Sequence, residues 1–408
     1  MYATGFLSDR GGLDQQLLWR LVGKKTVDMT ARMLEEFMEA ERAEWLGAGS
    51  YERTTRRRGH RNGYYRRTYD TCAGPLRLRV PRVRGYGFRS VVFDAYERRQ
   101  RKVDDAVLAW VARGMSARKA AESLAEVFGT VVSPATVSNV VARLDSDIEA
   151  FHTRTLAGGY RYLWIDAKHG YTSHRRRRRG RGKKLKRALF VAWGMRWDGR
   201  EELVDFRLAP GETEEAWTGF LTDLEARGIT PESASGGQSR GLEMIVTDGD
   251  GALEAAKLTV YPTVPHQRCA FHKVQNIAEH LDDRTHRRAI LSDAAFIYKD
   301  LRTIPEALRR LHEWSARWRD LEPRAVANFR TDFEWTLRYL TAAPAWRRRL
   351  KTTNPVERLI RELTRKIDQV GVFPTDTSWE RATYLTWLNL KAGGYAPTKP
   401  KPHFTHRS

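Results

Sequence analysis

Two aspartates stand where carboxylates could act together on a phosphodiester. Asp166 and Asp248 each follow an apolar run typical of a buried strand. Adjacent strand ends would bring the two side chains together at a sheet edge, where clustered carboxylates can hold two hard divalent cations such as Mg²⁺. The alternative is that each Asp is a turn or capping residue. Asp250 is predicted to be a local helix cap.

A glutamate near the C-terminus has two possible roles. Asn354-Pro355-Val356-Glu357 fits a helix start, with Asn as N-cap, Pro at the first position and Glu at the third. Spacing alone favours a capping box, in which Glu357 bonds the backbone. A role for Glu357 as a metal ligand remains open on these residues.

The chain has two cysteines, Cys72 and Cys269, too few for a disulfide framework, so a reducing cytoplasm is expected. Cys269 and His272 form a C-x-x-H pair. Zinc needs four ligands and no second pair is evident. We therefore expect a buried Cys and a hydrogen-bonded His that support the active site.

Charge points to a polyanionic partner. The 408 residues carry a net charge of +22, and residues 53–102 hold sixteen Lys and Arg against three acids. Nucleic acid is the first candidate and an anionic membrane surface the second. No apolar run reaches the ~18 residues of a membrane span. Hydrophobic residues make up 41% of the chain, and at roughly 150 residues per domain two or three domains are expected.

Two arginine-rich segments are predicted to bind DNA phosphates. The first is an N-terminal basic arm with Arg56, Arg57, Arg58, Arg61, Arg66 and Arg67. The second is residues 175–187, ten of thirteen basic, expected on a loop between strands; it starts with Arg175, Arg176, Arg177, Arg178 and Arg179. The alternative for this loop is a solvated charge run or a localisation tract.

The elements that position these residues divide at about residue 150. Residues 13–46 read as an amphipathic helix, and 76–80 and 82–93 as strand or extended arm. Residues 104–114, 116–129 and 133–145 read as capped helices, in a helix-turn-helix pattern or a plain three-helix bundle. In the first case the last helix presents Thr136, Ser138, Asn139 and Arg143 to a DNA groove.

Beyond residue 160 the pattern predicts an α/β domain with a mixed sheet. A short apolar strand run in RYLWIDAKHG (161–170), ending on Asp166, precedes two strands within 187–209 joined at Asp198-Gly199. A helix, a strand ending on Asp248 and another helix follow. Residues 276–350 look wholly helical, like an insertion. Their Trp314, Trp318 and Trp335 are expected in the core, with stacking on a DNA base as the alternative.

Several motifs, in order, resemble one known family. They are RRGHRNGYYRR (57–67), GPLRLRVPRVRGYGF (74–88), ARGMSARKAAESL (112–124), LWIDA (163–167), VAWGMRWDGREEL (191–203), Trp217 with LEARG (224–228), VTDGDGAL (246–253), QRCAFHKVQN (267–276), TTNPVERLIRELTRK (352–366) and GVFP (371–374). The chain resembles the DDE transposases of bacterial insertion sequences in the Mutator superfamily. Thr213 departs from the usual Ser, and Ile360 from the usual Asn.

The resemblance implies an RNase H-like catalytic domain with an all-helical insertion, preceded by a helical, helix-turn-helix DNA-binding region. It assigns Asp166, Asp248 and Glu357 as the metal-binding catalytic triad, and Cys269 and His272 as the C-x-x-H of the family. Two Mg²⁺ ions are implied, with Mn²⁺ as a substitute. The expected parts are a helix with a basic arm (1–103), helix-turn-helix-like helices (104–150), the first catalytic part (160–275), the insertion (276–350), the Glu-bearing helix (351–395) and a tail (396–408).

The implied activity is transposition. Such a transposase binds the terminal inverted repeats of its insertion sequence, cleaves the ends with two divalent metals and joins the 3′-OH to target DNA. A homodimer on double-stranded DNA is expected, in the cytoplasm with the nucleoid and with no membrane partner. The alternatives are a metal-dependent nuclease without strand transfer and a non-catalytic DNA-binding regulator.

Overall fold

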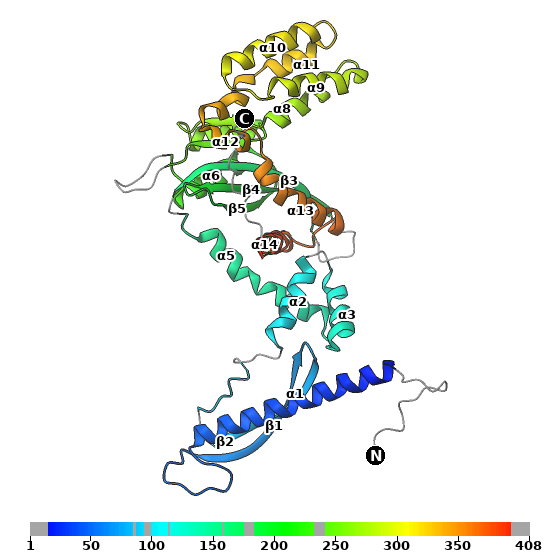
Figure 1. Cartoon of the computed structure of the whole chain (residues 1–408), viewed down its shortest axis with the longest axis vertical. Helices are drawn as coiled ribbons and strands as arrows, with labels where there is room; N and C mark the ends of the chain where they lie inside the picture. The colour runs from blue at the N-terminus through cyan, green and yellow to red at the C-terminus, as the bar shows by residue number, and fades with distance from the viewer. Residues whose placement is uncertain are drawn as a thin grey trace, which may run out of the picture. The chain divides into compact units, whose positions relative to one another are not determined.

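Two compact units, Met1–Arg143 and Leu144–Ser408, make up the chain (Figure 1). The computed structural model describes residues 15–84, 87–93, 99–112, 115–156, 159–174, 183–231 and 241–392. The tail expected at 396–408 lies outside these ranges. Within them, no helix has the length and apolar character needed to cross a membrane.

Unit 1 begins with a long helix packed on a hairpin. α1 (Gln15–Leu46) lies along the antiparallel strands β1 (His60–Thr71) and β2 (Gly74–Arg84) (Figure 1). Side chains along β2 alternate, and its Leu76, Leu78 and Val80 share a buried cluster with Met38 of α1. A two-stranded hairpin is marginal alone, so packing against α1 stabilises it.

The hairpin corrects the strand predictions for this region. β2 covers the expected strand at 76–80 but ends at Arg84, well before residue 93. β1 was missed because its residues are mostly exposed and show no apolar alternation. Pro81 sits opposite Tyr64 in the hairpin, where each strand has an unpaired edge that tolerates a missing N–H.

Three short helices complete unit 1. They are α2 (Arg101–Ala112), α3 (Ala117–Phe128) and α4 (Pro134–Ala142), and each packs against the other two. As predicted, the Ser116 and Ser133 hydroxyls cap α3 and α4, and Gly129 ends α3 in the left-handed conformation. The expected helix stop at Gly114 lies outside the described residues.

Unit 2 is built on a mixed five-stranded sheet, which confirms the mixed α/β class. The strand order is β5-β4-β3-β6-β7; β3 pairs antiparallel with β4 and parallel with β6. The Asp198-Gly199 turn joins β4 to β5 as predicted, whereas β7 was missed because it is three residues long. The strands are β3 (Tyr160–His174), β4 (Lys183–Arg196), β5 (Glu201–Ala209), β6 (Met244–Thr247) and β7 (His266–Arg268).

Helices pack on the sheet and bury its strands. α6 (Glu214–Ala226) and α7 (Gly251–Val260) share one core cluster with Leu163 and Ile165 of β3. Within it, the Trp217 ring stacks on Phe190 with centroids 3.5 Å apart. Other helices that pack against the strands are α5 (Leu144–Thr153), α13 (Asn354–Val370) and α14 (Asp376–Ala392).

All regular structure between β7 and α13 is helical, as expected for 276–350. Trp314 and Trp318 lie in the core of this stretch, whereas Trp335 is half-buried and packs edge-on against the His266 ring. That this stretch is an insertion in an RNase H-like fold stays a prediction. Its elements are α8 (Ala270–Asn276), η1 (Ile277–Glu279), η2 (Arg284–His286), α9 (Arg287–Ile297), α10 (Ile304–Trp318), α11 (Pro323–Arg330), η3 (Phe333–Thr341) and α12 (Pro344–Leu350).

Thr213, where Ser is usual in the resembling family, is the N-cap of α6, and its hydroxyl accepts the Ala216 N–H at 3.2 Å. Because Ser and Thr cap equally through this oxygen, Thr213→Ser is expected to leave the free energy of unfolding nearly unchanged. Thr213→Ala should lower it by about 1 kcal/mol. Urea unfolding followed by circular dichroism measures both, and equal stability of the two variants would contradict the capping role.

Candidate active site

β3 presents Asp166 toward the side of the sheet that faces α13. Successive strand side chains alternate between faces, and Leu163 and Ile165 point into the core with α6 and α7. Trp164 therefore points the other way, where its indole N–H donates to the Arg349 carbonyl at 3.3 Å. Asp166 shares the face of Trp164.

The position of Asp166 corrects the expectation that it ends a strand at a sheet edge. β3 is the middle strand of five and continues to His174, because its second half pairs with β4. What ends near Asp166 is β6, whose pairing with β3 covers only Tyr162 to Trp164. Asp166 is thus inside a strand, at the point where its neighbour stops.

The register of β3 and β6 brings the two aspartates abreast. Trp164 lies opposite Val246; Asp166 follows two residues later within β3, and Asp248 follows two residues later, directly after the end of β6. The Asp248 carboxylate accepts the Asp250 N–H at 3.1 Å within the turn that follows β6. Asp250 then caps α7 through the Leu253 N–H, as predicted.

Glu357 lies in the first turn of α13, but the expected capping box does not form. The helix begins at Asn354 and its N-cap is Thr353, whose side chain makes no capping hydrogen bond. Asn354 is already helical, so its side chain does not occupy the capping position. The Thr353 hydroxyl lies 3.4 Å from Glu357 Oε1 and 3.5 Å from Cys269 Sγ, so it connects the carboxylate to the C-x-x-H motif.

The segments that flank α13 are joined to the strands and to α8. Before the helix, the Lys351 carbonyl accepts the Ala270 N–H of α8 at 3.0 Å. After it, Phe373 forms an isolated bridge with β3, with the Phe373 N–H on the Tyr171 carbonyl and the Ser173 N–H on the Phe373 carbonyl. The helix that bears Glu357 is therefore tied to the strand that bears Asp166.

The pKa of Asp166 responds to the charges of both Asp248 and Glu357, so the three carboxylates lie close to one another. Burial raises the pKa of Asp166 to about 7, with the charge of Asp248 as the second cause and that of Glu357 adding to it. The cation of His272 acts in the opposite direction. Negative charge at this point of the sheet is thus incompletely compensated by the protein.

Cys269 and His272 lie beside this carboxylate group. Cys269 is fully buried before α8, and its hydrogen bond with His272 raises the pKa of that imidazole to about 9, with Asp166 and Asp248 contributing. Burial acts to raise the pKa of the Cys269 thiol, but hydrogen bonds from His272 and Thr353 lower it overall. His272 Nδ1 is buried without a hydrogen-bond partner.

Glu212 was missed by the sequence reasoning. It follows β5 as Asp248 follows β6, and its Oε1 lies 2.6 Å from Nε2 of His169. Burial raises the pKa of Glu212 to about 7, and the charges of Asp250 and Asp248 add to the effect. The only sequence signal for Glu212 was its position shortly after the second strand of the predicted hairpin.

The oxygen donors suit a hard divalent cation, because such cations prefer carboxylate oxygens and the His272 cation offsets only part of the effect of burial and of the neighbouring carboxylates on Asp166. The described residues nevertheless contain no group of three or more His, Cys, Asp or Glu side chains arranged to hold a metal ion. The carboxylates are therefore neighbours without forming a closed coordination shell. For the Cys269–His272 pair, the same finding gives no support to a zinc site.

The arginines predicted to bind DNA divide into two groups in unit 1. Arg56, Arg58 and Arg66 are exposed. The other three have internal contacts: Arg57 donates to the Glu52 and Gly59 carbonyls, Arg61 pairs with Glu39, and Arg67 lies over the Phe93 ring.

On α4, Ser138 and Asn139 are exposed, while Thr136 is half-buried with its hydroxyl 3.0 Å from that of Ser133. The exposed Arg143 pairs with Asp104 at 2.8 Å. For the basic loop, Lys183–Arg187 belong to β4, which corrects the expectation of a loop through residue 187. Its arginines at 175–179 lie outside the described residues.

Sequence comparison decides the family. Residues 21–392 match the description "Transposase, Mutator family". The chain belongs to the Mutator family of transposases. It is 33% identical over 346 residues to the transposase for insertion sequence element ISRM5 of Rhizobium meliloti (strain 1021), covering 85% of this chain and 82% of that protein.

A second Mutator-family relative is the transposase for IS256 in transposon Tn4001 of Staphylococcus aureus, 30% identical over 363 residues and covering 88% of each chain. Among solved structures, the Drosophila P element transposase strand transfer complex is similar over 75% of this chain and 80% of that one. The identity is 11% and the TM-score 0.30.

In this Mutator-family transposase, Gly249 determines the turn between Asp248 and Asp250. Its φ is +97°, and an added Cβ would lie 2.5 Å from Nε of Arg268, whose guanidinium pairs with Glu254. We expect Gly249→Ala to lower the free energy of unfolding by about 1–3 kcal/mol, because Ala at this φ is strained. Thermal unfolding measures the change.

Gly251→Ala, two residues along, is the matched control. An added Cβ there meets nothing within 4 Å and the backbone is helical, so Ala should be neutral or slightly stabilising. If the two variants unfold at the same temperature, Gly249 does not determine the turn in the way described.

Proposed function

We propose that this chain is a DNA transposase that cleaves the ends of its insertion sequence and joins the freed 3′-OH to target DNA. Asp166, Asp248 and Glu357 would be its catalytic carboxylates. The observation that carries the proposal is the parallel register of β3 and β6, in which Trp164 and Val246 lie opposite each other two residues before Asp166 and Asp248. The names of the Mutator-family relatives agree with it.

The three carboxylates would hold two Mg²⁺ ions, or Mn²⁺ in their place, because carboxylate oxygens are the preferred ligands of these cations. Bound cations supply an activated attacking oxygen and stabilisation of the leaving oxygen. The protein's own groups orient the carboxylates. The Asp250 N–H holds Asp248, and the Thr353 hydroxyl lies beside Glu357.

The proposed chemistry has two displacements at phosphorus. In the first, a water oxygen bonds to phosphorus at the end of the element, the 3′ oxygen leaves, and it takes up a proton as 3′-OH. In the second, that 3′ oxygen loses its proton and bonds to a target phosphorus, from which one DNA oxygen leaves. No covalent protein–DNA intermediate is needed, so no Ser or Tyr nucleophile is assigned.

Support for DNA as the partner comes from exposed cations in both units. Arg56, Arg58 and Arg66 are exposed in unit 1 and would contact phosphates, while Ser138 and Asn139 of α4 would contact bases. On α13, Arg361 and Arg365 are exposed on one face, beyond Glu357. They would contact a DNA backbone that leads to the carboxylates. A homodimer, expected from the resemblance, is part of the proposal.

The acidic triad is tested by neutral isosteres in purified protein with DNA that carries the element's ends. Asp166→Asn, Asp248→Asn and Glu357→Gln should each abolish cleavage while DNA affinity stays within about twofold, because an amide is a poor ligand for a hard cation. Denaturing gels measure cleavage and a mobility-shift assay measures binding. Joined products report strand transfer and separate a transposase from a nuclease.

Asp250→Asn is the control for these variants. Asn caps a helix as well as Asp does, so α7 should persist and cleavage should stay near the wild-type rate. Near wild-type cleavage by Glu357→Gln would remove Glu357 from the site. Cleavage without any joined product, under conditions where related transposases join, would favour the nuclease.

Salt dependence tests the basic arm. Replacement of Arg56, Arg58 and Arg66 by Ser removes up to three phosphate contacts, so the slope of log affinity against log salt should flatten by up to about three. Fluorescence anisotropy with full-length protein at several salt concentrations measures the slope.

A matched charge-removal variant replaces three exposed arginines in unit 2 by Ser: Arg309, Arg317 and Arg319. This variant should leave the slope within about one of the wild-type value. An unchanged slope in the arm variant, or an equal change in both, would contradict the role of the arm.

A further inference from the structure

α1 carries a second apolar face that nothing in the described part of unit 1 covers. Trp19, Met29, Met33 and Phe37 are 63%, 69%, 74% and 52% exposed, although such side chains are usually buried. With Val22 and Thr26 they recur at intervals of three and four residues. This spacing places all six on one stripe of a helix, as in a coiled-coil seam.

The stripe is distinct from the face that packs on the hairpin. Val27, Ala31, Leu34 and Met38 contact the buried cluster of β1 and β2. At about 100° per residue the centre of this face lies about 120° around the helix from the centre of the stripe. α1 is therefore apolar on two separate faces, and the hairpin accounts for one of them.

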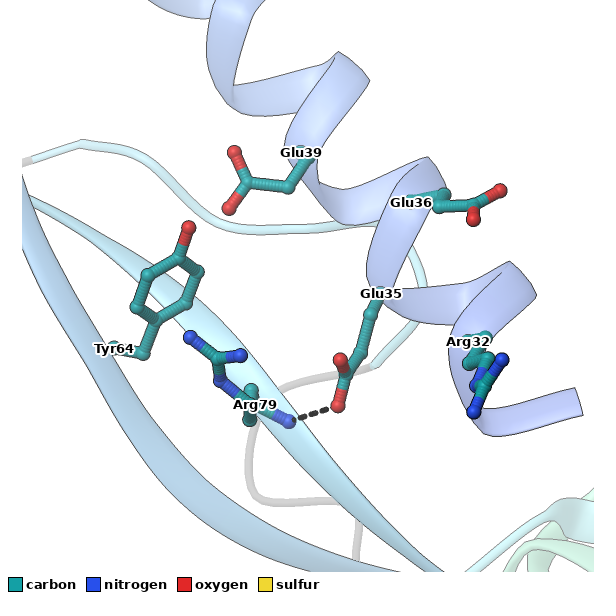
Figure 2. Close-up of a pocket in the computed structure, with 6 residues that line it drawn as sticks. All are labelled: Arg32, Glu35, Glu36, Glu39, Tyr64 and Arg79. Carbon is teal, nitrogen blue, oxygen red and sulfur yellow. Dashed lines mark hydrogen bonds between the residues drawn. The ribbon is translucent and has the colours of Figure 1, made fainter. Parts of the chain in front are cut away.

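Charge along α1 is divided between its halves. Residues 15–32 have four basic residues and one acid, and residues 33–46 have five acids and one base, Arg42, which is buried. Arg32 and Glu36 are exposed, and Figure 2 shows both pointing away from the hairpin. In the same view Glu35 and Glu39 turn toward Arg79 and Tyr64, with Glu35 accepting the Arg79 N–H.

We propose that the stripe of α1, from Trp19 to Phe37, is the site where a second copy of this chain docks, with the two α1 helices antiparallel. Among the charges beside the stripe, Lys25 lies in the basic half and Glu36 in the acidic half, on the same edge of the helix, and both are exposed. Antiparallel pairing sets Lys25 of each copy toward Glu36 of the other. A parallel pair would set like charges together. A second copy of α1 offers an apolar stripe to cover this one and, when antiparallel, charges of opposite sign beside it.

The dimensions of α1 suit this pairing. Its 32 residues extend for about 48 Å, and the stripe from Trp19 to Phe37 covers about 27 Å of that length. Each copy would bury large apolar side chains along this length, which is the geometry of a helix-to-helix dimer. This inference rests on the homodimer in the proposed function and names its interface. Its test measures self-association and not DNA cleavage, so the interface and the proposed catalytic activity can fail separately.

The first experiment measures mass in full-length protein without DNA. Wild type is expected to be a dimer at micromolar concentration by sedimentation equilibrium. Met29→Glu with Met33→Glu places four carboxylates in the seam of a dimer and should weaken association at least tenfold. Both side chains are exposed, so the fold of the protomer should persist, as circular dichroism and the unfolding temperature will report.

Val131→Glu is the matched control. Val131 is 88% exposed and lies outside α1, so the same substitution there should leave the dimer intact. A wild type that is monomeric at every concentration overturns the proposal. So does a dimer that survives in the Met29→Glu, Met33→Glu variant, or a monomer that binds vesicles of anionic lipid through α1.

The second experiment reads the orientation by disulfide cross-linking in a Cys72→Ser background, since Cys72 is exposed and Cys269 is buried. Trp19 is the first residue of the stripe, and Ala40 lies in line with it, three residues beyond Phe37. Antiparallel helices predict a cross-link when Trp19→Cys and Ala40→Cys proteins are mixed, and none in either alone. Cross-links within each single variant, and none between them, would show a parallel pair and overturn the orientation.

Discussion

The short parallel pairing of β3 with β6 constrains the whole candidate site. Because Trp164 lies opposite Val246, the two aspartates that follow are abreast before any other element is added. Alternation along β3 then decides which face Asp166 takes, and a helix on that face can bring the carboxylate of Glu357 near it. α13 is that helix. The site therefore depends on a register of three residue pairs.

The sequence predicted the elements well where a local signal was strong. The Asp198-Gly199 turn, the Ser116 and Ser133 caps and the Asp250 cap are each decided by one or two residues acting on their own backbone. Asp166 was placed at a strand end for want of non-local information. Its strand continues because β4 pairs with it, and a lone apolar run does not reveal its partners.

The same limit explains Glu357 and Glu212. Asn354-Pro355 has the form of a helix start, yet the helix begins one residue earlier. The Thr353 hydroxyl before it lies 3.5 Å from Cys269 Sγ, a contact between distant segments that the local sequence does not reveal. Glu212 has no motif at all, and only the folded sheet sets it near Asp248. Three arginines of the basic arm have contacts inside the protein that the sequence did not indicate: Arg57 donates to the Glu52 and Gly59 carbonyls, Arg61 pairs with Glu39, and Arg67 lies over the Phe93 ring. Their role in DNA binding stays a prediction.

Both segments that flank α13 are hydrogen-bonded to other elements of unit 2. Lys351 joins its start to α8, and Phe373 joins the segment after it to the far half of β3. Substitutions on the exposed side of α13 do not change the length of the helix. One inserted residue would rotate the rest of the helix by about 100°, although Lys351 and Phe373 would still be bonded to α8 and β3. In evolution the exposed side of the helix is therefore free to vary in composition, but the helix is not free to vary in length. In an alignment of proteins that share this arrangement, insertions and deletions should fall before or after α13 and not within it.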